Sequence, residues 1–147
     1  MPGAYPGAGG PRPENATQVT AVYSSGVATI ITPSENIGCD FSGQNSYAGC
    51  GIDSYVKATP YGHEGTNPRW WVEMSTEDSP GLTEPKIKSK NRAPAFQSPE
   101  TPPQTVPYGT VVYHGDYTCA SEITGLTCWN TTTGHGAFMT NFETITF

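Results

Sequence analysis

The sequence predicts an all-β fold, a small disulfide-stabilised sandwich or partly closed barrel of short antiparallel strands. Three observations lead to this prediction. The chain holds 17 glycines and 14 prolines, which place turns at short intervals. Aromatic residues make up 11% of it, and with the abundant threonines they favour strands. No apolar repeat of helical spacing extends beyond about two turns, so long helices are not expected.

Residues 1–16 are rich in proline, glycine and alanine. This composition offers too little apolar surface to offset the entropy lost on ordering, so we expect a flexible linker. Residues 17–147 are expected to form a single β domain, because 147 residues is the size of one domain. The chain opens without the features of an export signal, and we expect that a signal peptide, lipoprotein signal or membrane anchor has been removed.

The domain is expected to begin with two strands around a Ser-Ser-Gly turn, in residues 17–34. RWWVEM, residues 69–74, is a further strand candidate. Its alternation places Trp70 and Trp71 on opposite faces, one in the core and the other more exposed. The proline-rich residues 98–107 must be irregular or extended. Residues 108–147 contain three or four strands, for a total of about seven to nine in the domain.

Four cysteines fall into two local pairs, Cys39 with Cys50 and Cys119 with Cys128. Four cysteines allow three connectivities, so counting alone does not fix the pairing. Each local pair has the spacing of the two arms of one hairpin, joined by a four-residue loop, Gly-Gln-Asn-Ser or Glu-Ile-Thr-Gly. Neither pair has the CxxC spacing of a zinc or redox site. We therefore predict two local disulfides and an oxidising, extracytoplasmic location.

A resemblance to a known family rests on two stretches, TPSENIGCDF (residues 32–41) and VPYGTVVYHGDYTCASEITGLTCWNTTTGHGAFMT (residues 106–140). They resemble a family of small secreted proteins and lipoproteins of actinobacteria such as mycobacteria and corynebacteria, catalogued as a domain of unknown function. The shared motifs are Pro-Ser-x-Asn-Ile-Gly-Cys and Gly-Leu-Thr-Cys followed by Thr-Gly-His-Gly. The resemblance implies an exported, disulfide-bonded domain and brings no known reaction. In this chain Ala137 separates the last motif from Phe138, where the family has phenylalanine directly.

The formal net charge of −6, with only seven Lys and Arg residues, argues against nucleic acid as a partner, because phosphate neutralisation supplies most of that affinity. No run approaches the roughly 18 apolar residues of a membrane span. Four basic residues occupy every second position of one segment and would line one face of a strand. This stripe could bind an anionic polymer, a lipid head group or an acidic protein. Alternatively, it could protect a sheet edge from pairing with another chain. Its members are Lys86, Lys88, Lys90 and Arg92.

His135 stands between two glycines, and two interpretations stay open. It could act as a general base, with His114 and Asp116 beside it, or it could belong to a tight turn. Together with His63 and Glu64, these residues are candidate metal ligands. Their spacing matches neither HExxH nor a calcium loop. No metal and no cofactor is therefore predicted.

We therefore expect a non-catalytic extracytoplasmic binding or accessory module of an actinobacterial cell envelope, secreted or held at the membrane through the removed signal or anchor. It would recognise a protein, glycan or lipid partner. The alternative is a hydrolase-type enzyme centred on His135 with His114 and Asp116, and a third interpretation is a structural subunit of an envelope complex. The candidate binding residues are Trp70, Trp71, Lys86, Lys88, Lys90, Arg92 and His135.

Overall fold

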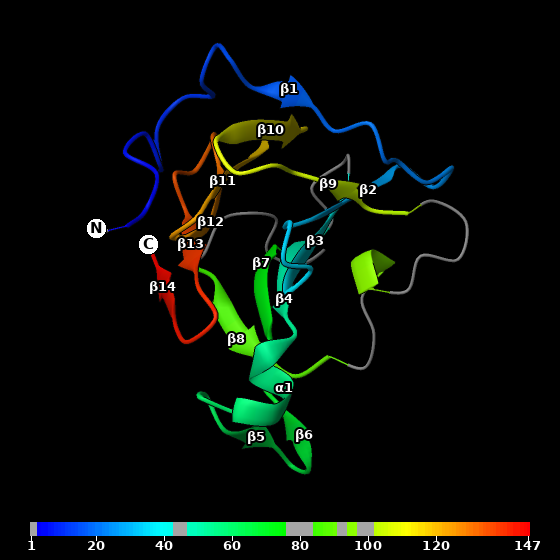
Figure 1. The fold of residues 1–147 in the computed structure, drawn as a ribbon, viewed down its shortest axis with the longest axis vertical. Coiled ribbons are helices and arrows are strands. Elements are labelled where there is room, and N and C mark those ends of the chain that lie inside the picture. Colours follow the sequence, from blue (N-terminus) through cyan, green and yellow to red (C-terminus); the bar gives the residue numbers. More distant parts are fainter. Residues whose placement is uncertain (1–2, 43–46, 76–83, 91–93, 97–101) are drawn as a thin grey trace.

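The computed structural model describes residues 3–42, 47–75, 84–90, 94–96 and 102–147. In these residues the fold consists of two six-stranded sheets and one two-stranded hairpin (Figure 1). Neither large sheet closes on itself, so the predicted all-β class is confirmed in its sandwich form rather than as a barrel. None of the described helices is both long and apolar enough to cross a membrane.

Sheet A holds most of the C-terminal third of the chain. Its neighbours pair antiparallel, except that the two-residue β1 runs parallel to β10. In spatial order its strands are β1 (Thr17–Gln18), β10 (Thr110–His114), β11 (Tyr117–Glu122), β12 (Gly125–Asn130), β13 (Gly136–Met139) and β14 (Thr144–Thr146).

Sheet B holds the first half of the domain and one later strand, β9, which lies parallel to β2. Two small elements extend from sheet B, the helix α1 (Ser54–Ala58) and the hairpin formed by β5 (His63–Glu64) and β6 (Asn67–Pro68). A short 3-10 helix, η1, spans Pro94–Phe96. In spatial order its strands are β8 (Lys86–Lys88), β7 (Trp71–Ser75), β4 (Ala48–Ile52), β3 (Ile37–Ser42), β2 (Val27–Ile31) and β9 (Gln104–Thr105).

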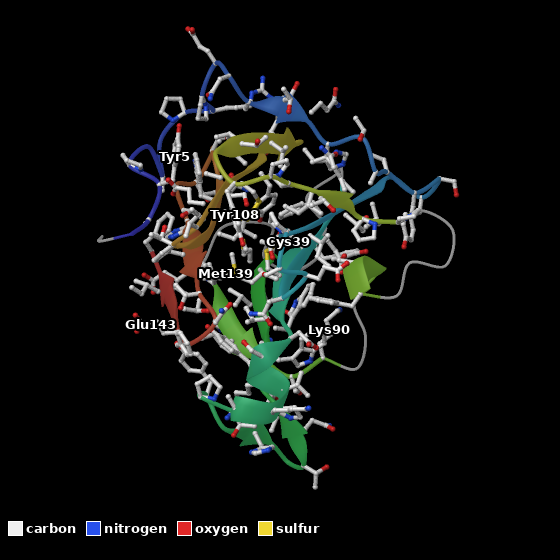
Figure 2. All side chains as sticks on the ribbon, in the orientation of Figure 1. Tyr5, Cys39, Lys90, Tyr108, Met139 and Glu143 are labelled. Atoms are coloured by element: carbon white, nitrogen blue, oxygen red, sulfur yellow. A yellow bond between two sulfur atoms is a disulfide. The ribbon has the colours of Figure 1, made fainter. Side chains whose placement is uncertain are left out.

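The core lies between the two sheets, and the two disulfides meet there. Cys39 bonds Cys50 between β3 and β4, and Cys119 bonds Cys128 between β11 and β12, which confirms the local pairing. The Sγ atoms of Cys39, Cys50 and Cys128 lie within 4.8 Å of one another, so the bridges face each other across the sandwich (Figure 2). Each links neighbouring strands of one sheet, and their contact joins the sheets.

The N-terminal segment is a packed element and not the flexible linker that its composition predicts. Residues 3–16, here called the N-terminal strap, run along the outside of sheet A (Figure 1). The Tyr5 ring stacks on Trp129, with centroids 5.8 Å apart, and the Trp129 indole N–H donates to the carbonyl of Gly10 at 2.9 Å. Arg12 lies 3.8 Å from the centre of the Tyr113 ring. The strap orders because it covers Trp129, which is fully buried.

The described part of the chain has more strands than the seven to nine predicted, because several short segments pair over only two residues. The second disulfide hairpin also differs in its loop. Ser121 lies opposite Leu126, as predicted, but pairing continues to Glu122 and Gly125. The loop is therefore two residues long, and not four. The tip of the first disulfide hairpin lies outside the described residues.

Candidate functional site

A groove of about 340 Å³ lies where turns of the two sheets meet. We call it the end groove. It is bounded by the β2–β3, β11–β12 and β13–β14 turns and by the chain just before β10. Its lining residues are Thr32, Ser34, Ile37, Tyr108, Glu122, Ile123, Thr124, Gly125, Thr140, Asn141 and Phe142.

The rim of the end groove is apolar and exposed. Five large apolar side chains are exposed in the described chain, and three of them line this groove: Ile123 at 85%, Phe142 at 82% and Tyr108 at 47% exposure. Each sits on a different connection. Large apolar side chains gathered at one place on a protein surface mark interaction sites more often than isolated ones do.

The β11–β12 turn presents Ile123 outward. Pairing through Glu122 and Gly125 leaves only Ile123 and Thr124 at the tip. A side chain at position 125 would collide with the carbonyl oxygen of Met139 on the next strand, so glycine is required where this tip passes β13. Thr124 also donates through its hydroxyl to the carbonyl of Gly3 at 2.7 Å, which ties the tip to the N-terminal strap.

The β13–β14 turn is held from both sheets. Within the turn, the Thr140 hydroxyl accepts the backbone N–H of Phe142 at 3.2 Å. Across the sandwich, the Asn36 amide donates to Asn141 Oδ1 at 2.7 Å, and the Ser54 hydroxyl donates to the Asn141 carbonyl at 2.9 Å. Asn36 belongs to the Pro-Ser-x-Asn-Ile-Gly-Cys motif. Its role here is to fix the turn that carries Phe142, so the rim is preorganised.

The chemistry of the end groove favours binding over catalysis. Its lining residues include no histidine, cysteine, lysine or arginine, and the Ser34 hydroxyl contacts the Thr32 hydroxyl and accepts the N–H of Asn36 rather than pairing with a base. Glu122 is the only carboxylic acid in the lining. This set offers an apolar rim, several hydroxyl and amide groups and one carboxylate, which are the components of a recognition site.

A second polar feature lies on the outer face of sheet B. Asp40 is fully buried there. Its Oδ1 accepts the backbone N–H of Ala95 at 2.9 Å, while its Oδ2 has no hydrogen-bond partner within the described chain. Burial raises the pKa of Asp40 from 3.8 to about 7, although the hydrogen bond from Ala95 and the charge of Lys90 oppose the shift. A near-neutral pKa at a buried group is an unusual feature of a strand.

Three glycines make room for aromatic rings on this same outer face. A Cβ at Gly49 would lie 2.5 Å from ring atoms of Trp71, and one at Gly51 would lie 2.5 Å from the ring of Trp70. At Gly38 a Cβ would approach Ala95 and Phe96 within about 3 Å. The rings therefore lie flat against the backbone of sheet B.

This packing corrects the prediction that one of the two tryptophans is exposed for binding. Trp70 is 9% and Trp71 is 4% exposed. The Trp70 indole N–H donates to the carbonyl of Lys90 at 2.7 Å, and the Lys90 ammonium lies 4.8 Å from the centre of the Trp71 ring. Both rings are buried because glycines face them, so they form no exposed aromatic surface.

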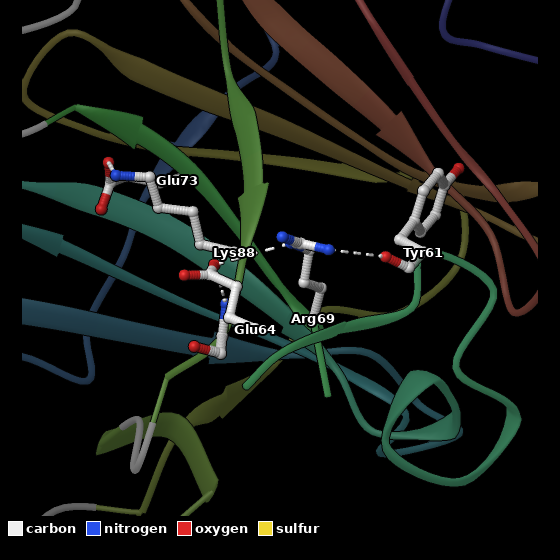
Figure 3. A network of polar contacts seen from close by, with 6 residues as sticks. Tyr61, Glu64, Arg69, Glu73 and Lys88 are labelled. Atoms are coloured by element: carbon white, nitrogen blue, oxygen red, sulfur yellow. Dashed lines mark hydrogen bonds and ion pairs between the residues drawn. The ribbon is translucent and has the colours of Figure 1, made fainter. Parts of the chain in front are cut away.

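The predicted cationic stripe is not a free row of charges. Lys86 and Lys88 lie in β8, at the edge of sheet B, which agrees with the edge-protection interpretation. The Lys88 ammonium pairs with the carboxylate of Glu73 at 3.1 Å, as Figure 3 shows. Lys90 covers Trp71, and Arg92 lies outside the described residues.

Polar contacts also join the β5–β6 hairpin to the chain after β8 (Figure 3). Glu64 accepts the backbone N–H of Ser89 at 2.9 Å, and its carboxylate lies 3.7 Å from Arg69 Nε. Arg69 donates in turn to the carbonyl of Tyr61 at 3.4 Å. Glu64, a candidate metal ligand by its sequence, thus holds the hairpin in place.

Two of the three histidines contact backbone carbonyls, and the third, His63, is exposed in β5. His135 lies in the turn between β12 and β13, and its Nδ1 is 3.2 Å from the carbonyl oxygen of Phe147. His114 Nε2 is 3.2 Å from the carbonyl oxygen of Gly26. A backbone carbonyl is neither a nucleophile nor an acid, so these contacts give the hydrolase alternative no catalytic pair. The tight-turn interpretation of His135 fits them.

Among the described residues, one group of three potential metal ligands comes together, Cys39, Cys50 and Cys128. All three belong to disulfides. A sulfur atom in a disulfide is not the thiolate that binds metals, so this group is part of the core.

Reasoning from the sequence missed the rim residues Tyr108, Ile123 and Phe142 and the buried Asp40. Tyr108 precedes Gly109, and Ile123 lies two residues before Gly125; turns of this kind are where binding residues concentrate. Phe142 follows a Thr-Asn pair in a turn. Asp40 carries one local signal, because it is an acidic residue directly after a cysteine of a predicted buried strand.

Comparisons of the chain with protein-family models, with curated proteins and with solved structures each found no match. The assignment of function therefore rests on the geometry of the chain itself. The two disulfides indicate an oxidising, extracytoplasmic environment.

Proposed function

We propose that this protein is a non-catalytic extracytoplasmic recognition module that binds a polypeptide segment of a partner protein in the end groove. The observation that carries the proposal is the exposed rim of Tyr108, Ile123 and Phe142 around a groove of about 340 Å³. A few large side chains at the centre of an interface supply most of its binding energy. This rim offers three such side chains.

The frame around the rim supports the proposal. Turns from both sheets build the groove, and hydrogen bonds from Asn36 and Ser54 hold the turn of Phe142. A rim that is already ordered loses little conformational entropy on binding. Recognition by turns gathered at one end of a β sandwich is a common use of this architecture.

A polypeptide fits the rim better than a glycan or a lipid. Tyr108 and Phe142 have flat rings on which a sugar can stack, but Ile123 has none. The hydroxyls that would hydrogen-bond a sugar already have protein partners, and these are the hydroxyls of Thr32, Ser34, Thr124 and Thr140. For lipid head groups, the candidate cations of the 86–92 segment are in part paired or packed on rings. An apolar rim with few free polar groups suits peptide side chains.

Secretion or anchoring in an actinobacterial envelope is part of the same proposal. It is supported by the disulfides and by the two motifs that resemble the actinobacterial family. A partner would then be another exported protein or an exposed loop of a membrane protein.

The test is selection from a random dodecapeptide library displayed on phage, with the immobilised protein as bait. Peptides should be enriched on the wild type and lost on the double variant Ile123→Ser/Phe142→Ser. Val56, an apolar residue of α1 with 41% exposure, provides the matched control, because Val56→Ser removes exposed apolar surface away from the groove. Equal enrichment on all three proteins, or none on the wild type, would overturn the proposal.

A further inference from the structure

One group in the end groove has no partner. Glu122 is the last residue of β11, beside the tip that carries Ile123. Its Oε1 is shielded from solvent and has no hydrogen-bond partner in the described part of the chain. A carboxylate is an acceptor only, and leaving such an oxygen buried without a donor costs free energy. A ligand donor that reached this oxygen after a small shift of the Glu122 side chain would recover this cost.

The neighbouring polar groups do not compete for this role. The Thr32 hydroxyl contacts the Ser34 hydroxyl at 3.2 Å and accepts the N–H of Ile37. The Thr124 hydroxyl donates to Gly3. Asn141 Oδ1 accepts the amide of Asn36. Among these groups, Glu122 is the one with a carboxylate oxygen that receives no hydrogen bond within the described residues.

The charge of the groove points to the same ligand. Glu122 is the only carboxylic acid of the lining, which includes no lysine or arginine, and the protein as a whole has a formal charge of −6. A cation that enters the groove meets a negative charge with no competing protein cation in the lining. Electrostatic complementarity of this kind selects partners and speeds association.

We propose that the end groove takes a polypeptide segment in which a lysine or arginine adjoins an apolar side chain. This inference rests on the proposed function and adds the chemistry of the ligand. The apolar side chain lies against Ile123 and Phe142, and the cation donates to Glu122. Either cation fits, because lysine and arginine are hydrogen-bond donors with no acceptor of their own.

The test uses the peptides selected from the dodecapeptide library. They should share a Lys or Arg next to a Leu, Ile, Phe or Trp. For the best of them, fluorescence polarisation should show an affinity at least about tenfold weaker with Glu122→Gln, since breaking a close charge pair at an interface removes that much or more. Replacement of the peptide cation by methionine should weaken wild-type binding similarly and have little further effect in the variant.

Glu143→Gln is the matched control, because Glu143 is an exposed acid on the β13–β14 turn and does not line the groove. It should change the affinity by less than about twofold, as expected for an exposed rim charge. Selected peptides without a common cation, or equal losses for Glu122→Gln and Glu143→Gln, would overturn the ligand chemistry while leaving peptide binding intact. Failure to select any peptide would overturn both proposals.

Discussion

Replacement of Asp40 by asparagine should change how stability depends on pH. The pKa of Asp40 is raised from 3.8 to about 7 in the folded protein, so between these values the folded state holds a proton that the unfolded state releases. Each pKa unit corresponds to about 1.36 kcal/mol. The wild type should therefore lose up to about 4 kcal/mol of unfolding free energy as pH rises from about 4 to about 7.

The Asp40→Asn variant lacks this loss. Its side-chain oxygen can still accept the N–H of Ala95, and its NH₂ group takes the place of the unpaired Oδ2. Above pH 7 the variant should be more stable than the wild type by up to a few kcal/mol, because it buries no charge there. Near pH 4 the two proteins should differ little, since Asp40 is protonated in the folded wild type.

The assay is urea unfolding at half-unit steps from pH 4 to pH 8.5. At each pH the unfolding free energy of the wild type is subtracted from that of the variant. The difference removes the contribution of all other titrating groups. Asp53→Asn serves as control, because it removes an exposed acid, at the start of α1. A pH dependence of the Asp40→Asn difference no larger than that of this control would refute the burial of the Asp40 carboxyl group.

Three further changes test the packing. Tyr5→Ser should loosen the N-terminal strap and lower the free energy of unfolding by about 1–3 kcal/mol. It should also shift the fluorescence emission of Trp129 to longer wavelength, and unchanged emission would contradict the packing of the strap on Trp129. Gly136→Ala should destabilise by at least about 1–3 kcal/mol, because the new Cβ meets a carbonyl oxygen of β12; wild-type stability would show that this contact is absent. The double variant Cys39→Ser/Cys50→Ser should lose about 2–5 kcal/mol, and a cysteine count in the unreduced wild type should find no free thiol.

Local patterns predicted the disulfide hairpins, because both arms and their cysteines lie within a dozen residues of each other. The pairing of Ser121 with Leu126 followed directly from that spacing. The parallel pairings of β1 with β10 and of β2 with β9 could not be predicted from the sequence. They join segments far apart in the sequence over two residues each, and so short a segment has no period to detect.

The burial of both tryptophans shows where the alternation rule fails. The rule places Trp70 and Trp71 on opposite faces, but β7 begins at Trp71, and both rings lie against glycines on the outer face of sheet B. The rule also does not say whether a face is covered. Here glycines at positions 49 and 51 alternate around Cys50, and this spacing leaves space on the outer face that the rings of Trp70 and Trp71 fill. Alternating glycines in a strand signal the close approach of another group.

The end groove could not be predicted because four separate connections build it. Ser34, Tyr108, Ile123 and Phe142 are brought together only by the order of strands in the two sheets. The N-terminal strap was missed for a different reason. Its composition is typical of disorder, and the partner that orders it, Trp129, lies more than a hundred residues away.

The central claim is that the end groove is the recognition surface. The most direct measurement is the map of amide chemical-shift changes in ¹⁵N-labelled protein titrated with the best peptide of the selected set. The largest changes should cluster at Tyr108, Glu122, Ile123 and Phe142, and Ile123→Ser/Phe142→Ser should abolish them. Changes centred on the outer face of sheet B, around Trp71, or on the N-terminal strap would contradict this account.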